Sequence, residues 1–381
     1  MRVARPLLRP STRLQPRRLA STIAILDTSH PGDTRSLQNW LTNNPQGRPR
    51  CLLGKTEGNG CVNDFSRGYA SHVVSTTLGD RRGDCSIIMS GGTEGVLTPH
   101  LLLLADDGVT SSSAAPPPDA RLSFGVSRTR DFLPAEIGRV EQVEATIDAV
   151  LAACADANLA PSECAFVQIK CPLLTPERLA ASDKACATPD GYYSMALSRG
   201  ASALGVALAS GELDSSAVYS SLEAGHLCSP EMLSWAVSNV ASASAGIELM
   251  HSEVFVLGNA MGSTSSLRAA HTVMADAVDA PAVFRMLESA GLDTKHGSLT
   301  DEARGRVKAV LAKADPAASV RGQRTTMLTD SDLNATRHAR ASVGGLLAGI
   351  FGETRLYVSG GAEHQGPNGG GPVCVLYEAS S

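Results

Sequence analysis

Three short apolar runs of the chain each end in a lysine. The runs are CLLGK, FVQIK and AVLAK, which close at Lys55, Lys170 and Lys313. Unbroken apolar runs of this length are typical of buried strands. The pattern therefore predicts three buried strands with a lysine at the end of each.

Each lysine is followed by a stretch with helical signals and an arginine near its start. The three stretches are 63–79, 194–211 and 334–349. Each closes on a glycine, which is common just beyond the last helical turn. The spacing from arginine to glycine is the same for Arg67 and Gly79, Arg199 and Gly211, and Arg337 and Gly349. Arg340 is an alternative in the third stretch, so two candidate arginines stay open there.

After each helical stretch the chain repeats one motif: Ser, a small residue, Gly, any residue, Glu. It reads SGGTEG from Ser90, SAGIEL from Ser244 and SGGAEH from Ser359. A strand-like run follows each copy, at 100–106, 252–258 and 372–378. The repeating order is strand, Lys, helix with Arg, strand, Ser turn, strand. This order indicates an α/β fold with helices packed on one face of each sheet.

The threefold recurrence also divides the chain into domains. We expect repeat unit A at 21–110, a Pro- and Ser-rich linker at 111–120, unit B at 121–262 and unit C at 263–381. Residues 1–20 form a basic extension with six arginines and no acidic residue. This composition is typical of a mitochondrial transit segment, whereas its prolines suit a basic arm on the surface. Cytoplasmic and mitochondrial locations both stay open.

Composition excludes several classes of partner. A net charge of −5 and an aromatic content of 4% disfavour nucleic acid. The apolar runs are far shorter than the roughly 20 residues of a membrane span, so we expect no membrane partner. The nine cysteines lack metal or redox spacing, and we predict reduced thiols in an intracellular compartment.

The recurring polar residues suggest one shared site. Taken singly, a lysine ending a strand, an arginine opening a helix and a Ser-Gly turn are ordinary surface features. Together they supply the chemistry of a Ser-Lys hydrolase. A buried lysine with a lowered pKa can remove the proton of a serine, which then becomes a nucleophile. The small residues after serine let backbone N–H groups approach a carbonyl oxygen as an oxyanion hole.

The sequence resembles the family of cyanuric acid hydrolases and barbiturases, which open cyclic imide or amide rings. The resemblance covers the chain from about Ser29 onward and is carried by strings in all three units. These are GKTEGNGCVNDFSRG from Gly54, MSGGTEGVLTPH from Met89, VQIKCPLLT from Val167, HSEVFVLGNA from His251, TMLTDSD from Thr326 and SGGAEHQGPNGGGP from Ser359. It implies three concatenated α/β repeat units around a pseudo-threefold axis, with a β-barrel-like centre and helices outside. Three equivalent Lys, Arg and Ser sets would then bind the threefold symmetric ring of cyanuric acid.

By this resemblance Ser244 is the nucleophile and Lys170 is its base. An acyl-enzyme would be hydrolysed to carboxybiuret, which loses carbon dioxide to give biuret. The alternative activity is that of a barbiturase, which opens barbituric acid to ureidomalonate. The family often has serine at the position of Ala245, so here a side-chain contact is lost while a backbone contact survives. The remaining substrate-binding residues implied are Ser90, Gly91, Ala245, Ser359, Gly360, Arg67, Arg199, Arg337, Arg340, Lys55 and Lys313.

The glycine-rich loop at 361–372 has a separate interpretation. Its glycines can turn backbone carbonyls toward a hard cation, although a plain glycine-rich loop is the alternative. The resemblance implies a structural divalent or monovalent cation, with Mg²⁺ or Ca²⁺ favoured, and no cofactor for catalysis. Its implied ligands are Ala362, Gln365, Gly366, Pro367, Gly370 and the carboxylate of Asp315. Asp315 stands where the family tends to have Glu. The resemblance also implies a homo-oligomer, a tetramer.

Two other classes of function stay open. A ligand-binding or signalling protein could retain the cavity without turnover, although Ser244 and Lys170 are both present. A phosphate-binding protein could use the glycine-rich loops, but none has the spacing of a P-loop or of GxGxxG. Hydrolysis of a cyclic imide by the purified protein separates the enzyme from both.

Overall fold

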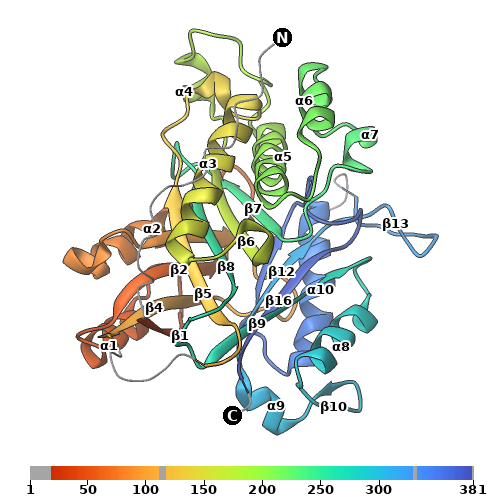
Figure 1. Ribbon diagram of the computed structural model, residues 1–381. Helices are drawn as coiled ribbons and strands as arrows, with labels where there is room; N and C mark the ends of the chain where they lie inside the picture. Colours follow the sequence, from red (N-terminus) through yellow and green to blue (C-terminus); the bar gives the residue numbers. More distant parts are fainter. Residues whose placement is uncertain (1–18, 111–116, 329–332, 380–381) are drawn as a thin grey trace.

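The molecule consists of three concatenated α/β units that meet at a common centre (Figure 1). The computed structural model describes residues 19–110, 117–328 and 333–379. The expected transit segment thus lies almost wholly outside the described residues, as does 111–116 of the expected linker. Within the described residues no helix is long and apolar enough to cross a membrane.

The first unit forms a sheet with the strand order β1-β4-β2-β3. Strands β2 and β3 are parallel, and β4 is antiparallel to both β1 and β2. Helix α2 packs against β3. The elements are β1 (Leu19–Asp27), α1 (Arg35–Asn43), β2 (Arg48–Thr56), α2 (Phe65–Leu78), the 3₁₀ helix η1 (Gly79–Arg82), β3 (Ser86–Gly91) and β4 (His100–Thr110).

The second unit repeats this topology in the order β5-β8-β6-β7. Helices α3 and α5 pack on the sheet and on each other. Three helices are added to the common pattern, α4 (Pro176–Ala180), α6 (Ser215–Glu223) and α7 (Pro230–Leu233), together with the 3₁₀ helices η2 (Pro134–Glu136) and η3 (Pro161–Glu163). The common elements are β5 (Arg121–Arg128), α3 (Val140–Ala157), β6 (Cys164–Pro172), α5 (Gly191–Ser210), β7 (Ala241–Gly246) and β8 (Glu253–Ala260).

The third unit repeats it again in the order β9-β16-β12-β15. Its additions are α9 (Asp301–Arg306) and two short hairpins, β10 (Thr294–Lys295) with β11 (Ser298–Leu299) and β13 (Ser319–Val320) with β14 (Gln323–Arg324). The common elements are β9 (Leu267–Met274), α8 (Ala280–Ser289), β12 (Val307–Ala314), α10 (Ala335–Phe351), β15 (Tyr357–Gly360) and β16 (Gly371–Glu378).

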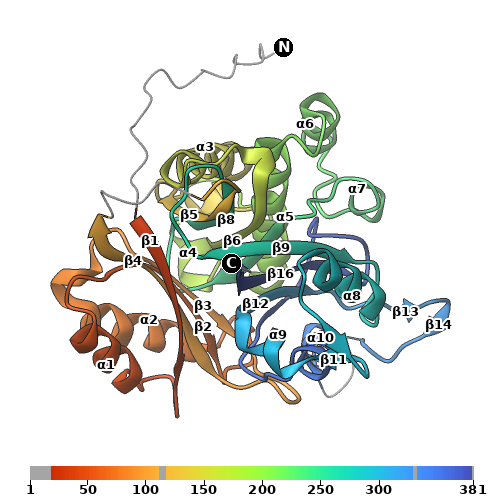
Figure 2. The same cartoon turned by 60° about the horizontal axis from the view of Figure 1, so that its bottom comes forward.

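The three sheets turn one face inward and carry their helices on the other, as Figure 2 shows. One hydrophobic core draws on all three sheets and joins the units at the centre. It includes Leu53, Leu102, Phe166, Phe255, Leu311 and Leu376. Each sheet is a separate hydrogen-bonded ladder among the described residues, so the barrel-like centre is held by side-chain packing between sheets.

The arginine-bearing helices are the ones expected, but the third ends later than predicted. An Asp or Asn side chain caps the first turn of each, through Asp64, Asp190 and Asn334. Helix α10 runs through Gly349 and ends at Gly352, which has a left-handed φ of 66°. The assignment of Gly349 as the closing residue was therefore wrong, because the chain there still makes helical hydrogen bonds.

Candidate active site

The three lysines and three serines lie side by side at the centre of the molecule. In each unit a strand ending in the lysine pairs in parallel with the strand ending in the serine. The register places the two residues directly opposite one another: Lys55 and Ser90, Lys170 and Ser244, Lys313 and Ser359. All six side chains are buried. The strand-ending lysines of the sequence therefore belong to three matching Lys–Ser pairs.

Each lysine also reaches into a neighbouring unit. Its Nζ donates a hydrogen bond to the carbonyl of the residue just before another unit's serine. These bonds run from Lys55 to Val358 at 2.7 Å, from Lys170 to Met89 at 2.6 Å and from Lys313 to Ala243 at 2.6 Å. The bonds form a closed cycle through the three units, so each lysine position depends on two units.

The second pair differs from the other two. Lys55 Nζ lies 3.2 Å from the Ser90 hydroxyl, and Lys313 Nζ lies 3.2 Å from the Ser359 hydroxyl. The Ser244 hydroxyl is buried without a hydrogen-bond partner among the described residues. Lys170 Nζ instead lies 3.0 Å from a carboxylate oxygen of Glu248. The three sets are thus alike in position and unlike in contacts.

Burial lowers the pKa of all three lysines, because the charged ammonium loses its hydration. The charge of Arg340 lowers the pKa of Lys55 further, and that of Arg199 lowers the pKa of Lys313 further. For Lys170 the Glu248 carboxylate acts against burial and raises the pKa. Burial alone would raise the pKa of Glu248, but Lys170 and Arg67 together hold it below its ordinary value. A lowered lysine pKa makes the neutral amine available as a base.

The arginines bind the glutamates of the serine motifs across unit boundaries. Arg340 of the third unit binds Glu94 of the first, with Nη2 to Oε1 at 2.6 Å. Arg199 of the second unit binds Glu363 of the third, with Nε to Oε2 at 2.7 Å. These buried, two-pronged contacts fix both side chains in one geometry. The first and third motif copies and the arginines that bind them thus connect the units in the opposite cyclic order to the lysines.

Of the two arginines left open in the third unit, Arg340 occupies the place equivalent to Arg67 and Arg199. It is buried and has the same spacing to Gly352 as Arg67 has to Gly79. Arg337 also contacts Glu94, at 3.2 Å, but a third of its side chain is exposed. The matching spacing found for Arg337 came from the wrong closing glycine.

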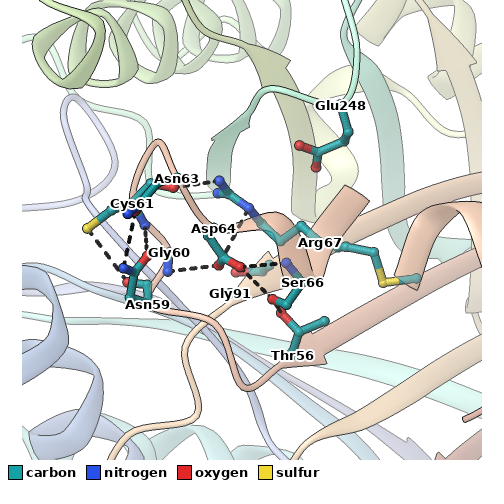
Figure 3. A network of polar contacts seen from close by, with 12 residues as sticks. Thr56, Asn59, Gly60, Cys61, Asn63, Asp64, Ser66, Arg67, Gly91 and Glu248 are labelled. Atoms are coloured by element: carbon teal, nitrogen blue, oxygen red, sulfur yellow. Dashed lines mark hydrogen bonds and ion pairs between the residues drawn. The ribbon is translucent and has the colours of Figure 1, made fainter. Parts of the chain in front are cut away.

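Arg67 has a different set of partners. Its Nη1 donates to the carbonyl of Ala245, at 2.8 Å, and its Nη2 donates to the carbonyl of Cys61. Its Nε lies 3.7 Å from Asp64, which also accepts the N–H groups of Gly60 and Ser66. Figure 3 shows this network and Glu248 of the second unit. Because Glu248 pairs with Lys170, the third Arg–Glu bond of the cycle is replaced here.

Glycine is required where the arginines cross the serine motifs. Gly92 has a φ of 97°, and a Cβ there would lie 2.5 Å from the guanidinium of Arg340. Gly361 has a φ of 78°, and a Cβ there would lie 2.7 Å from that of Arg199. Both the left-handed backbone and the close guanidinium exclude a larger residue. Gly91 and Gly360 precede them, and their carbonyls accept bonds from Lys55 and Lys313.

The glycine-rich loop packs against the site and contacts one partly buried carboxylate. Asp315 accepts the N–H of Gly369 at 2.8 Å, and burial raises its pKa to about 6. The carbonyls of Ala362 and Pro367 accept turn bonds from Gln365 and Gly370. The Gln365 side chain accepts the N–H of Ala243, next to Ser244. The loop thus connects the region expected to hold a cation with the strand of Ser244.

The residues missed by the sequence reasoning are the motif glutamates Glu94, Glu248 and Glu363. The signal was present, because glutamate is the fifth residue of every copy of the motif. The repeat drew attention to the serine, while the glutamate bears the ion pairs with Lys170, Arg199 and Arg340.

None of the nine cysteines is in a disulfide, and Cys154 and Cys164 approach to 3.5 Å between sulfurs.

Comparison with known proteins gives matches over nearly the whole chain. Residues 22–378 match the family model described as amidohydrolase ring-opening protein (Amido_AtzD_TrzD). The cyanuric acid amidohydrolase of Bradyrhizobium diazoefficiens is 47% identical, with 93% of this chain and 96% of the relative covered. That of Pseudomonas sp. strain ADP is 45% identical, with 92% and 96% covered.

Two solved structures share the fold. One is a cyanuric acid hydrolase described as an evolutionary innovation by structural concatenation, with a TM-score of 0.85 and 42% identity over 95% of this chain and 100% of the other. The second is a cyanuric acid hydrolase from A. caulinodans, with a TM-score of 0.83 and 41% identity over 95% and 99%. Together with the three matching Lys–Ser pairs, these similarities show that the chain belongs to the family of ring-opening amidohydrolases.

Proposed function

We propose that this protein is a cyanuric acid amidohydrolase that opens the ring to carboxybiuret, which then loses carbon dioxide to give biuret. The observation that carries the proposal is the cyclic arrangement of three Lys–Ser pairs in one register around one centre. Cyanuric acid presents three equivalent edges, each with C=O and N–H groups. Three equivalent sets of donors and acceptors match three such edges. The names of the relatives support the same substrate.

Ser244 is the nucleophile and Lys170 the base in the proposed reaction. Its hydroxyl is without a partner among the described residues, which leaves it available to a ring carbonyl. Burial lowers the pKa of Lys170, so its neutral amine can accept the proton of Ser244, and Glu248, 3.0 Å away, then holds the ammonium that forms. Attack gives a tetrahedral intermediate, its collapse opens the ring, and water activated by Lys170 hydrolyses the acyl-enzyme.

The other residues of the centre bind and polarise the ring. Ser90 and Ser359 are held by their lysines and face the two edges that are not attacked. The backbone N–H groups of Gly91, Ala245 and Gly360 lie after the three serines and are the candidate oxyanion donors. Arg199 and Arg340, through their glutamates, hold two of the serine turns in place. Arg337 lies at the margin of this set and Arg340 within it.

A structural cation, Mg²⁺ or Ca²⁺, is proposed in the loop after Ser359. The fit rests on Asp315, a partly buried carboxylate whose Oδ2 accepts one N–H group. The carbonyls of Ala362, Gln365, Gly366, Pro367 and Gly370 complete an oxygen donor set of the kind hard cations prefer. A bound cation would supply positive charge that stabilises the loop. Assembly into a tetramer stays a prediction, which sedimentation of the purified protein tests. Import into mitochondria also stays a prediction, which localisation of a tagged chain in cells tests.

The experiment that tests the function is an assay of purified protein with cyanuric acid. Biuret and carbon dioxide, in equal amounts, should appear as cyanuric acid disappears. Ser244→Ala is the matched control for a contaminating hydrolase, because only the protein's own activity is lost in it. Binding of cyanuric acid without turnover would instead support a ligand-binding protein. Turnover of barbituric acid but not cyanuric acid would support a barbiturase.

A further inference from the structure

A layer of buried side chains lies one step below the Lys–Ser pairs. Side chains two residues apart on a strand point to the same face, so this layer consists of the residues two before each lysine and each serine. In the first unit they are apolar, Leu53 and Ile88. In the second and third units the layer contains Gln168, Ser242 and Tyr357, and each of these is fully buried. The layer does not follow the threefold repeat.

The polar members of this layer have unpaired atoms. Gln168 Oε1, the Ser242 hydroxyl and the Tyr357 hydroxyl are all buried with no hydrogen-bond partner among the described residues, as is the Ser244 hydroxyl above them. A buried polar atom without a partner costs free energy that an apolar residue would avoid. Gln168 and Ser242 lie below the Lys170–Ser244 pair, and unpaired polar atoms beside this serine point to a functional reason for their presence.

Tyr357 is the member placed to act on that serine. Strand β15, which it begins, packs against both β7 and β2, the strands of Ser244 and Lys55. The ring of Tyr357 lies under Lys55, with Nζ 5.8 Å from its centroid. Burial raises the pKa of the Tyr357 phenol, while the neighbouring hydroxyls of Ser90 and Ser244 act in the opposite direction. The phenol thus stays protonated at neutral pH and is a hydrogen-bond donor.

We infer that the Tyr357 hydroxyl is a positioning donor to the Oγ of Ser244 and thereby makes that serine, of the three, the nucleophile. As Lys170 removes the proton from Ser244, negative charge grows on Oγ. A hydrogen bond donated by Tyr357 stabilises this charge and fixes the direction of Oγ. The phenol keeps its proton throughout, so no proton is gained or lost. In the third unit, Leu311 and Tyr357 lie below the pair of Lys313 and Ser359. In the first unit, the Ser90 hydroxyl already contacts the Nζ of Lys55.

The inference rests on the proposed function and is tested with Tyr357→Phe. The substitution removes the hydroxyl and keeps the ring that packs in the central core. We expect kcat on cyanuric acid to fall about 10- to 100-fold, the loss expected for one hydrogen bond to a charged group. KM should change less than twofold, because the hydroxyl acts on the serine and not on the ring. The melting temperature should not fall. Tyr377→Phe removes the hydroxyl of another buried tyrosine of the same sheet, and its kcat should equal that of the wild type.

A second comparison decides which serine the phenol serves. In a Ser90→Ala background, Tyr357→Phe should lower kcat by the same factor as in the wild type, since Ser244 is still present. If the effect vanishes in that background, Tyr357 acts through Ser90 and the inference is overturned. The inference is also overturned if Tyr357→Phe leaves kcat unchanged in an active enzyme. The same holds if the fall in kcat is accompanied by a fall in melting temperature, because loss of folding would then explain the loss of activity. Single-turnover acylation of Ser244, followed by mass spectrometry, should slow with kcat. An inactive wild type would instead count against the proposed function.

Discussion

Lys170 differs from Lys55 and Lys313 in having a carboxylate 3.0 Å from its Nζ. In the first and third units the glutamate of the motif binds an arginine. In the second unit the same residue, Glu248, binds the lysine. An ion pair at a buried base stores a proton beside the place where the reaction needs to move one. One change of partner thus separates the proposed reacting set from the two proposed binding sets.

The first prediction concerns the proposed pair. Ser244→Ala and Lys170→Ala should each lower kcat by about 10³-fold or more, because a nucleophile and its base act as one unit. The double variant should be no slower than either single variant. Steady-state assays at saturating cyanuric acid give the comparison, with melting curves as the check on folding. A double variant much slower than both would show that the two residues act independently.

The second prediction concerns pH. The base has to be neutral, so kcat/KM should fall as pH drops below the pKa of Lys170 in the free enzyme. Glu248 raises that pKa, and Glu248→Gln removes its negative charge. The pKa of Lys170 should then fall further, and the acid limb of the profile should move to lower pH. A limb that stays in place, or moves to higher pH, would exclude Lys170 as the titrating base.

Polar residues could be predicted from the sequence where they recur, and not where they break the repeat. Lys55, Lys170 and Lys313 stand out because equivalent positions keep the same unusual residue. Tyr357 and Gln168 have apolar or unlike equivalents, Ile88 and Leu53 among them, so repetition gives no signal for them. Their importance depends on burial and on missing partners, which only the folded chain reveals.

At the scale of elements, the pattern common to the three units contains one strand and one helix more than the sequence pattern predicted. The pattern began at the strand that ends in lysine. Each unit instead begins with an edge strand and then a helix, and both come before the lysine strand: β1 and α1, β5 and α3, β9 and α8. These strands and helices carry none of the Lys, Ser or Arg residues of the centre, so they share no polar marker across units. The strands and helices that meet the centre were the ones the sequence could predict.

Helix α10 offers a direct test of its own end point. Gly349 is exposed within the helix, and nothing lies within 4 Å of a Cβ placed there. Gly349→Ala should therefore raise the free energy of unfolding by up to about 1 kcal/mol. Gly352 has a φ of 66°, and its Cβ would lie 2.4 Å from Arg304, so Gly352→Ala should lower it by about 1 kcal/mol or more. Urea denaturation measures both. The opposite signs would place the helix end at Gly349.

The glycine-rich loop is the element whose stability should depend on a cation. Adding Ca²⁺ or Mg²⁺ to chelator-treated protein should raise the melting temperature, because a ligand that binds the folded state stabilises it. Asp315→Asn should abolish the rise, since it removes the carboxylate. Activity per folded molecule should change little, as the loop does not contain Ser244. Loss of activity in chelator at an unchanged melting temperature would contradict a structural role for the ion.

At the scale of the whole molecule, the centre belongs to no single unit. Each lysine donates to a carbonyl of a neighbouring unit, and each of two arginines binds a neighbour's glutamate. The hydrophobic core beneath them also draws on all three sheets. Cutting one unit away would leave buried charges without partners, which is strongly destabilising. A site of this kind requires the three units in one chain or in close association.

Symmetry at this scale also governs the choice of substrate. Barbituric acid carries CH₂ where cyanuric acid has one of its N–H groups. A centre in which three equivalent sets each bind one edge of the ring leaves one protein acceptor unpaired with barbituric acid. An unpaired buried group costs about 1–3 kcal/mol, so kcat/KM for barbituric acid should be lower by about 10-fold or more. The first and third units keep their Lys–Ser contacts, and the second keeps the Ala245 carbonyl bound to Arg67.

The measurement is kcat/KM for both compounds with one preparation of enzyme. Ser90→Ala and Ser359→Ala are the informative variants, because each removes a hydroxyl from an edge that is not attacked. Each should lower kcat/KM for cyanuric acid more than for barbituric acid whenever the methylene can occupy the altered edge. The preference for cyanuric acid should therefore shrink in at least one of them. A higher kcat/KM for barbituric acid in the wild type would mean that the three edges are not equivalent, with Ala245 of the second unit as the first position to examine.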